Sequence, residues 1–275
     1  MLSMLRLLVI LTILNSSVFA NANKEIESFL SEKFSENPRF KSVEVKVEDS
    51  VKIKELQGWS GYIVDIKAHI KKPKRDIEER MIWFSNGRYI TRELTDMQTG
   101  LSVRNDIIPT MKESYYRDEN LIYGDKNAKH RVAIFSDPMC PFCKRYVPKA
   151  IKDMKKSPNK FAIYYYHLPL SRIHPASMSV VKCAIAAELA GVKDVELKIY
   201  NLPIKVSLGD EKLILEKFNK AMGTKLTLKD INSKKVLQRI KDDADISEKL
   251  LVKGTPTVYF DGKIDIVKNK YKKVK

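Results

Sequence analysis

The chain has 275 residues, of which 44% are hydrophobic and 31% charged, with only three cysteines. This composition excludes intrinsically disordered, collagen-like and disulfide-stapled classes, and the length suits one large domain or two ordinary ones. The net charge of +17 comes mainly from 39 lysines spread along the chain, against 12 arginines. Nucleic-acid-binding proteins usually depend on arginine and on a concentrated basic patch. We therefore interpret the charge as a solubilising surface and expect no nucleic-acid binding.

The first 20 residues have the three parts of a secretory signal peptide. One positive charge precedes the apolar run LLVILTIL, and small residues stand at the end of the polar stretch that closes at Ala20. The run is too short for a transmembrane helix, which needs about 20 apolar residues. We expect cleavage after Ala20 or, alternatively, after Ala22. The mature protein is then expected in the periplasm, where disulfides persist.

Residues 21–105 predict a small α+β domain made of a helix and an antiparallel sheet. Apolar residues at helical spacing indicate a helix over Glu25–Phe34. Alternating apolar residues then predict strands around residues 43–47 and 62–70, and an Asn-Gly turn predicts a hairpin over residues 80–92. The region has no cysteine and no cluster of catalytic residue types. We therefore expect this domain to have a positioning role rather than to contribute catalytic residues.

The pattern changes after this first domain. Periodic apolar residues over 106–120 predict a linker helix, and residues 121–275 predict an α/β domain in which strands and helices alternate. The expected elements of that domain are strands over Leu121–Tyr123, Val132–Ser136 and Phe161–Tyr166, a helix from about Pro141 to Lys156, a mostly helical stretch over 176–250, and a final hairpin of Thr257–Phe260 with Ile264–Val267.

The sequence Cys140-Pro141-Phe142-Cys143 follows an apolar strand and opens the predicted helix. Two residues between the cysteines let one helical turn bring the sulfurs together. Unpaired N–H groups and the positive end of the helix dipole favour the thiolate form of Cys140, and Pro141 stands where a helix tolerates proline. Cys143 lies one turn further in, which suits a resolving thiol. The motif predicts thiol–disulfide exchange through a mixed disulfide.

Two other interpretations of the cysteine pair remain open. A zinc site requires two such cysteine pairs or a matching histidine pair. Neither Cys183 nor the histidines have that spacing, so we expect no metal. A purely structural disulfide is the second alternative, although a surface CxxC bridge is strained. We expect no cofactor other than the redox-active Cys140–Cys143 disulfide itself.

A second signal lies more than a hundred residues later, at Gly254-Thr255-Pro256. Only about 5–6% of X-Pro bonds in folded proteins are cis. A glycine followed by Thr-Pro and a buried strand is nevertheless typical of the cis-proline loop that packs against the CxxC helix in thioredoxin folds. Proline there offers no N–H, and the backbone of the preceding residue can pair with an extended substrate chain. We expect Thr255 and Pro256 to form this substrate-binding loop.

Together these motifs resemble the periplasmic thiol:disulfide oxidoreductases related to the isomerases DsbC and DsbG. The segment from Leu121 to the CPFC motif is similar to the start of their catalytic domain, and residues 87–100 to the end of their dimerisation domain. The resemblance implies a V-shaped homodimer with thioredoxin-like catalytic domains, in which Cys140 is the nucleophile and Cys143 the resolving thiol. It also implies disulfide-containing or unfolded periplasmic proteins as substrates, and a membrane redox partner of the DsbD or DsbB type.

The chain departs from these relatives in several places. Cys183 matches one partner of a second disulfide whose other partner is missing, so we expect a buried free thiol. The oxidase DsbA, which the chain also resembles, has an acid six residues before its first cysteine and a histidine inside the motif, where this chain has Ile134 and Phe142. The segment after Val267 is short and lysine-rich, so the last thioredoxin helix is expected to be truncated. The leading function is disulfide isomerisation or reduction, and the alternatives are a DsbA-like oxidase and a non-catalytic, chaperone-like binding protein.

Overall fold

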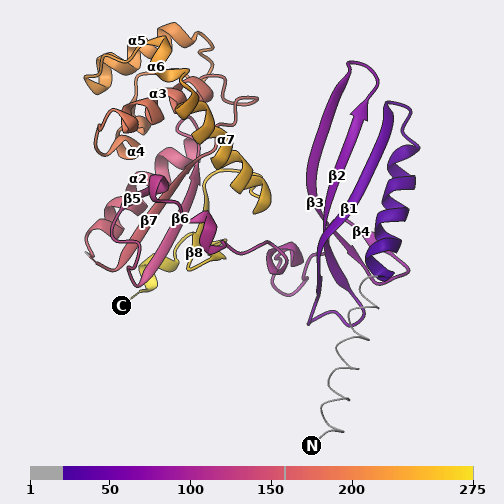
Figure 1. The fold of residues 1–275 in the computed structure, drawn as a ribbon. Coiled ribbons are helices and arrows are strands. Elements are labelled where there is room, and N and C mark those ends of the chain that lie inside the picture. Colours follow the sequence, from indigo (N-terminus) through magenta and orange to yellow (C-terminus); the bar gives the residue numbers. More distant parts are fainter. Residues whose placement is uncertain (1–20, 158, 275) are drawn as a thin grey trace, which may run out of the picture. The chain divides into compact units, whose positions relative to one another are not determined.

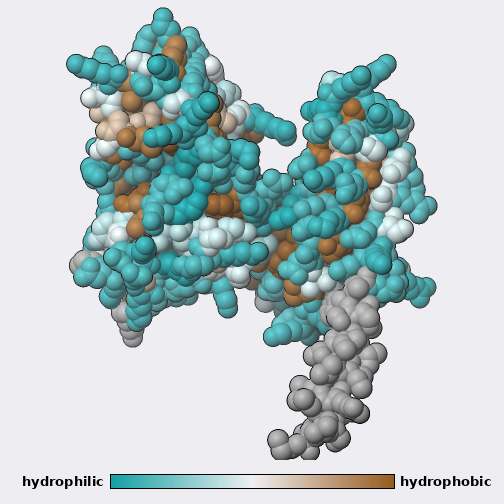
Figure 2. All heavy atoms as spheres, in the orientation of Figure 1, coloured by the Kyte–Doolittle hydropathy of each residue, from teal (hydrophilic) through white to brown (hydrophobic). Residues whose placement is uncertain are grey.

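The computed structural model describes residues 21–157 and 159–274, so the predicted signal peptide lies outside the described residues. The chain divides into two compact units between Ile108 and Pro109 (Figure 1). Both tryptophans, Trp59 and Trp83, lie in the first unit, whereas ten of the twelve tyrosines lie in the second. In the view of Figure 2 the described surface is mainly hydrophilic, in keeping with the lysine-rich composition. No helix within the described residues is long and apolar enough to cross a membrane.

The first unit is a helix packed on a four-stranded antiparallel sheet of order β1-β2-β3-β4 (Figure 1). Residues 21–35 are helical. Ile26 and Leu30 of this helix pack on Tyr62 and Val64 of the sheet, which explains the apolar periodicity of the helix. The strands are β1 (Phe40–Lys52), β2 (Ser60–Ile70), β3 (Arg75–Ser85) and β4 (Ile90–Thr91).

The hairpin predicted from Asn86-Gly87 is confirmed. Ser85 of β3 pairs with Ile90 of β4, and Gly87 adopts a φ of 84°, which a residue with a side chain rarely adopts. The Asn86 side chain accepts hydrogen bonds from the backbone N–H groups of the two residues that follow Gly87. The turn is therefore closed by its own side chain as well as by the strand pairing.

The linker helix predicted over residues 106–120 does not form. The structure has three separate 3-10 turns instead, η1 (Val103–Asp106), η2 (Glu113–Tyr115) and η3 (Asp118–Asn120). Pro109 has no N–H to continue a helix, and its ring disfavours the helical conformation of the residue before it. Ile107 and Met111 are nevertheless buried, so the periodic apolar residues reflect packing of an irregular segment.

The second unit has a five-stranded sheet of order β5-β7-β6-β8-β9, in which β6 and β7 run parallel and the other pairs run antiparallel. Its strands are β5 (Leu121–Tyr123), β6 (His130–Ser136), β7 (Phe161–His167), β8 (Thr257–Phe260) and β9 (Lys263–Ile264). Helix α2 (Pro141–Lys155) connects β6 to β7. Every residue of β7 is buried, as expected for a parallel strand covered on both faces.

A helical insertion separates β7 from β8 and gathers beside the sheet (Figure 1). Its elements are α3 (Ser177–Leu189), α4 (Val195–Lys198), η4 (Ile199–Asn201), α5 (Glu211–Met222), α6 (Leu228–Ile231) and α7 (Lys234–Lys249). Helix α3 packs against α4, α5, α6 and α7. After β9, one 3-10 turn, η5 (Lys270–Lys273), is the last described element. The expected fold class is confirmed: a thioredoxin-like α/β domain with a helical insertion and a small α+β domain before it.

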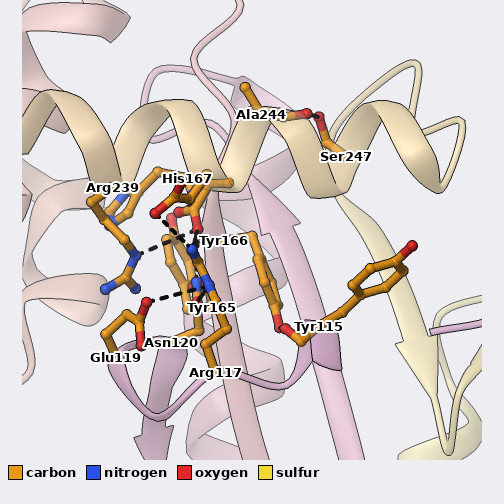
Figure 3. A network of polar contacts seen from close by, with 12 residues as sticks. Tyr115, Arg117, Glu119, Asn120, Tyr165, Tyr166, His167, Arg239, Ala244 and Ser247 are labelled. Atoms are coloured by element: carbon orange, nitrogen blue, oxygen red, sulfur yellow. Dashed lines mark hydrogen bonds and ion pairs between the residues drawn. The ribbon is translucent and has the colours of Figure 1, made fainter. Parts of the chain in front are cut away.

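A buried polar network fastens the insertion to the sheet (Figure 3). The carboxylate of Asp243 on α7 is fully buried and accepts hydrogen bonds from Arg117 Nη2 at 2.7 Å and Asn120 Nδ2 at 2.9 Å. It also accepts one from the backbone N–H of His167 at 2.9 Å, and Arg239 Nε lies 3.4 Å away. One carboxylate thus ties α7 and the segment before β5 to the end of β7.

Candidate active site

Cys140 stands at the N-cap position of α2, directly after the loop that follows β6. Its backbone is extended, with φ −71° and ψ 124°, and Pro141 takes the first helical position. No side chain caps this end of the helix. Cys140 therefore stands at the end of α2 where the N–H groups of the first turn have no side-chain partner and where the positive end of the helix dipole lies.

The loop between β6 and α2 is built around Asp137, whose side chain is fully buried. The Asp137 carboxylate accepts hydrogen bonds from the backbone N–H groups of Met139 at 2.8 Å and Leu170 at 2.9 Å. His174 Nδ1 lies 2.8 Å from the same carboxylate, and Ser177 Oγ donates to it at 2.6 Å. Asp137 O also accepts from the N–H of Cys140. Four contacts thus hold the Asp137 carboxylate in place, and the Asp137 carbonyl binds the N–H of Cys140.

Thr255 and Pro256 lie against the first cysteine. The Thr255–Pro256 peptide bond is cis, and Cys140 Sγ lies 3.5 Å from Thr255 O, to which its thiol donates. Proline supplies no N–H at this point of the loop. The structure thus brings together the two motifs that the sequence singled out, although 115 residues separate Cys140 from Thr255.

Cys143 lies one turn into α2 and is fully buried. Burial is the main cause that raises the pKa of the Cys143 thiol to about 12, and repulsion from Cys140 acts in the same direction. The side chains of Ser136 and Thr255 and the backbone of Asp137 act in the opposite direction, because hydrogen-bond donors favour the thiolate. Both cysteines are buried, with exposed fractions of 4% for Cys140 and 0% for Cys143, but Cys140 stands at the helix end against Thr255, whereas Cys143 lies one turn further into the core.

An open groove of about 440 Å³ runs beside the cysteines. Phe142 is 62% exposed at one side and Val267 is 72% exposed at the other. The Arg145 guanidinium lies 5.0 Å from the Phe142 ring centroid, so a cation covers part of the apolar surface. The lining residues are Phe142, Arg145, Tyr146, Thr255, Pro256, Val267 and Lys268. The groove offers an apolar surface, two cations and the backbone of the proline loop to an extended chain.

Cys183 and a second, larger cavity also lie in the second unit, apart from this groove. Cys183 is a free thiol buried in α3, as expected, and burial raises its pKa to about 12. A larger cavity of about 670 Å³ lies between α3 and α7, and no cysteine lines it. Among the described residues, no group of three or more histidine, cysteine or acidic side chains could hold a metal ion.

Sequence reasoning missed several residues of this site. Ser136 ends the buried strand β6 and Asp137 follows it directly, and polar residues at this position were a usable signal. Lys268 belongs to the short, lysine-rich segment after Val267, for which no role in the site was expected, yet Tyr146 donates a hydrogen bond to its carbonyl at 2.9 Å and it lines the groove. The strand predicted over Ile264–Val267 is too long, because β9 ends at Ile264 and the chain then turns around the buried Asp265.

Two cysteines at the start of a helix, beside a loop with a cis-proline and on a sheet of this order, define a thioredoxin-like domain. A sequence model of the thioredoxin family, described as "Thioredoxin", matches residues 117–275. This match covers more than half of the chain, and the protein therefore belongs to the thioredoxin family.

Curated relatives are similar to about half of the chain. The protein is 26% identical over 148 residues to Na(+)/H(+) antiporter NhaA 1 of Mycolicibacterium gilvum, covering 52% of this chain and 23% of the antiporter. It is 27% identical over 150 residues to the protein of the same name from Mycobacterium sp. strain KMS, with the same coverage. The chain thus spans about a quarter of the length of the curated relatives it matches.

Solved structures with a similar fold include a thioredoxin-like oxidoreductase from Silicibacter pomeroyi, with a TM-score of 0.48 and 17% identity over 56% of this chain and 88% of that one. ScsC of Proteus mirabilis in a compact conformation has a TM-score of 0.45 and 22% identity, covering 56% of this chain and 74% of the other. Oxidised BdbD from Bacillus subtilis has a TM-score of 0.44 and 17% identity, covering 56% and 92%.

Proposed function

We propose that this protein is a thiol:disulfide interchange enzyme that isomerises or reduces non-native disulfides in secreted proteins. The observation that carries the proposal is the placement of Cys140. It caps α2, its sulfur lies 3.5 Å from the Thr255 carbonyl of the proline loop, and Cys143 is buried one turn behind it. A purely structural cysteine pair would not need a groove and a proline loop beside it.

The reaction begins when the Cys140 thiolate attacks a substrate disulfide. A bond forms between Cys140 Sγ and one substrate sulfur, and the other substrate sulfur leaves with the electron pair. Two outcomes follow from the mixed disulfide. The freed substrate thiol can attack a different disulfide and return Cys140 unchanged, which is isomerisation. Alternatively, Cys143 attacks Cys140 Sγ, which completes reduction of the substrate and leaves the Cys140–Cys143 disulfide.

The groove supplies the binding surface for this substrate. Phe142, Pro256 and Val267 offer apolar contact, and Arg145 and Lys268 add positive charge. Thr255 presents its backbone to an extended chain, which could pair with it as an added strand pairs with a sheet edge. An unfolded segment that exposes apolar residues around a cysteine fits this surface better than a folded, polar one.

Location, assembly and partners complete the proposal. The apolar leader before Ala20 supports export to the periplasm, with cleavage after Ala20 or Ala22. We propose a homodimer formed through the first unit, where Phe29, Tyr89 and Met97 are 49%, 58% and 97% exposed. A DsbD-type membrane partner would keep the cysteine pair reduced, as an isomerase of the DsbC and DsbG kind requires.

The alternative within the same fold is a DsbA-like oxidase, which Pro141 inside the motif favours. The two functions need opposite resting states of the Cys140–Cys143 pair. The first test is therefore acid quench and thiol alkylation of periplasmic extract. A mostly reduced pair supports the isomerase or reductase, whereas a mostly oxidised pair supports the oxidase and a DsbB-type partner. A chaperone-like binding protein would instead keep its activity after Cys140→Ser.

A further inference from the structure

A chain of three buried hydroxyl groups lies behind the second cysteine. Ser136 Oγ, at the end of β6, lies 2.6 Å from Tyr200 Oη in η4. Tyr200 Oη lies 2.7 Å from Tyr165 Oη of β7. All three side chains are buried, and Tyr165 and Tyr200 pack in the same core cluster as Cys143. The Ser136 side chain acts to lower the pKa of the Cys143 thiol, so the chain of hydroxyls begins near Cys143 and ends in the core.

Burying three hydroxyl groups in an apolar core costs free energy unless they find partners. Here they pair with one another, and phenylalanine rings could fill the space of the two tyrosines. Burial raises the pKa of Tyr165 and Tyr200 well above that of an ordinary tyrosine. Both hydroxyls therefore keep their protons in the working pH range and act as donors, not as bases.

The other groups that face Cys143 are few. They are Cys140, the Thr255 hydroxyl and the backbone of Asp137. The Asp137 carboxylate, which faces Tyr200, is already bonded to Met139, Leu170, His174 and Ser177. Ile134, six residues before Cys140, is buried and has no carboxylate to offer. The Thr255 hydroxyl is buried without a hydrogen-bond partner, so this hydroxyl and the hydroxyl chain are the side-chain donors available to a thiolate at Cys143.

We propose that the hydroxyl chain of Ser136, Tyr200 and Tyr165 stabilises the Cys143 thiolate as it forms, and so sets the rate at which Cys143 resolves the mixed disulfide. This proposal rests on the resolving role of Cys143 in the proposed function. Ser136 donates to the sulfur, Tyr200 donates to Ser136, and Tyr165 donates to Tyr200. Hydrogen bonds in such a series strengthen one another, and more so in a low dielectric.

The step conserves protons and electrons without any further reagent. Cys143 Sγ bonds to Cys140 Sγ while the bond from Cys140 to the substrate sulfur breaks, and that sulfur leaves with the electron pair. The Cys143 proton passes through solvent to the departing substrate thiolate. The cysteine pair is oxidised by two electrons and the substrate disulfide is reduced. No hydroxyl of the chain loses its proton, so the three residues position and stabilise rather than transfer.

The test uses the full-length reduced protein and an equimolar amount of dithiobis-nitrobenzoate, an aromatic disulfide whose released thiolate is coloured. Attack by Cys140 releases one coloured thiolate, and resolution by Cys143 releases the second. Stopped-flow absorbance should show two phases. The second phase should be absent from Cys143→Ala, which identifies it as the resolving step.

Tyr200→Phe should slow the second phase about tenfold at neutral pH, the effect of losing about 1.4 kcal/mol of thiolate stabilisation. Its pH profile should move to higher pH, and the first phase should not change. Ser136→Ala and Tyr165→Phe test the two ends of the chain, with a larger effect expected for Ser136→Ala. The matched control is Tyr166→Phe, the neighbour of Tyr165 on β7, whose hydroxyl donates to the backbone carbonyl of Tyr115.

The proposal is overturned if Tyr200→Phe and Ser136→Ala leave the rate and pH profile of the second phase unchanged, or if Tyr166→Phe slows it equally. A wild-type protein without a second phase, or one whose second phase survives Cys143→Ala, would instead refute the resolving role of Cys143. The failure of this inference and the failure of the proposed function thus give different traces.

Discussion

At the scale of single residues, three chemically identical side chains have three different environments. Cys140 sits at a helix end under the Thr255 carbonyl. Cys143 is buried one turn further on, and Cys183 is buried in α3 with no cysteine partner. Because the thiolate is the reactive form, these environments assign a separate behaviour to each sulfur.

The first residue-scale prediction concerns the mixed disulfide. Cys143→Ala should accumulate covalent complexes at Cys140, because the sulfur that would release them is gone. Cys140→Ala should form none and should lose all exchange activity. Non-reducing gels of periplasmic extract, followed by mass spectrometry, measure both. Cys183→Ala is the matched control and should behave as wild type. Complexes that persist in Cys140→Ala would contradict the assignment of the nucleophile.

The second residue-scale prediction concerns alkaline pH. The folded pKa of Cys183 is raised to about 12 from an ordinary value of 9.0. Above pH 9 the unfolded chain therefore loses a proton that the folded chain keeps, and the free energy of unfolding falls as pH rises. Between pH 8 and 10, wild-type reduced protein should lose about 1.4 kcal/mol more stability than Cys183→Ala. Urea titrations followed by far-UV circular dichroism measure this. Equal losses would mean that the thiol is not buried in solution.

At the scale of elements, the position of α7 depends on one carboxylate. Asp243 binds Arg117 and Asn120 from the segment before β5 and the N–H of His167 at the end of β7, so it joins α7 to two other segments (Figure 3). Its removal would leave Arg239, Asn120 and the N–H of His167 without the carboxylate that they face, whereas Arg117 would keep its pair with Asp242 at 2.9 Å. Breaking a buried polar network in this way is strongly destabilising.

We therefore predict that Asp243→Ala lowers the free energy of unfolding of the second unit by about 3–5 kcal/mol. The control is Asp245→Ala on the same helix. Asp245 pairs with Lys241 at 3.0 Å, but its side chain is 43% exposed, and such a pair contributes at most about 1 kcal/mol. Urea unfolding of both variants provides the comparison. Similar small losses in the two variants would show that the network does not hold α7.

At the scale of the whole molecule, the division between Ile108 and Pro109 separates the exposed apolar residues of the first unit from the cysteines of the second. If dimerisation belongs to the first unit, removal of residues 21–105 should give a monomer. The cysteine pair should still react with small disulfides, because the site lies wholly in the second unit. Light scattering after gel filtration measures the mass. A truncated protein that stays dimeric would place the interface elsewhere.

The sequence predicted those features whose signals are local. The CPFC motif, the strands on either side of α2 and the loop at Thr255-Pro256 each have their own short pattern. The prediction of a linker helix was wrong because the apolar periodicity of residues 106–120 was given more weight than the helix-breaking effect of Pro109. Tyr200 and His174 could not be predicted as neighbours of the site. They lie 64 residues from Ser136 and 37 from Asp137, and only the path of the helical insertion brings them back.

The distribution of aromatic residues gives each unit its own optical signal. Trp59 and Trp83 belong to the first unit, whereas the second contains ten tyrosines and no tryptophan. Indole emission therefore follows the melting of the first unit, and phenol ellipticity in the near ultraviolet follows mainly the second. A single sample can report two separate melting curves without any label. A tryptophan placed at Phe142 would add a fluorescent reporter beside the cysteines.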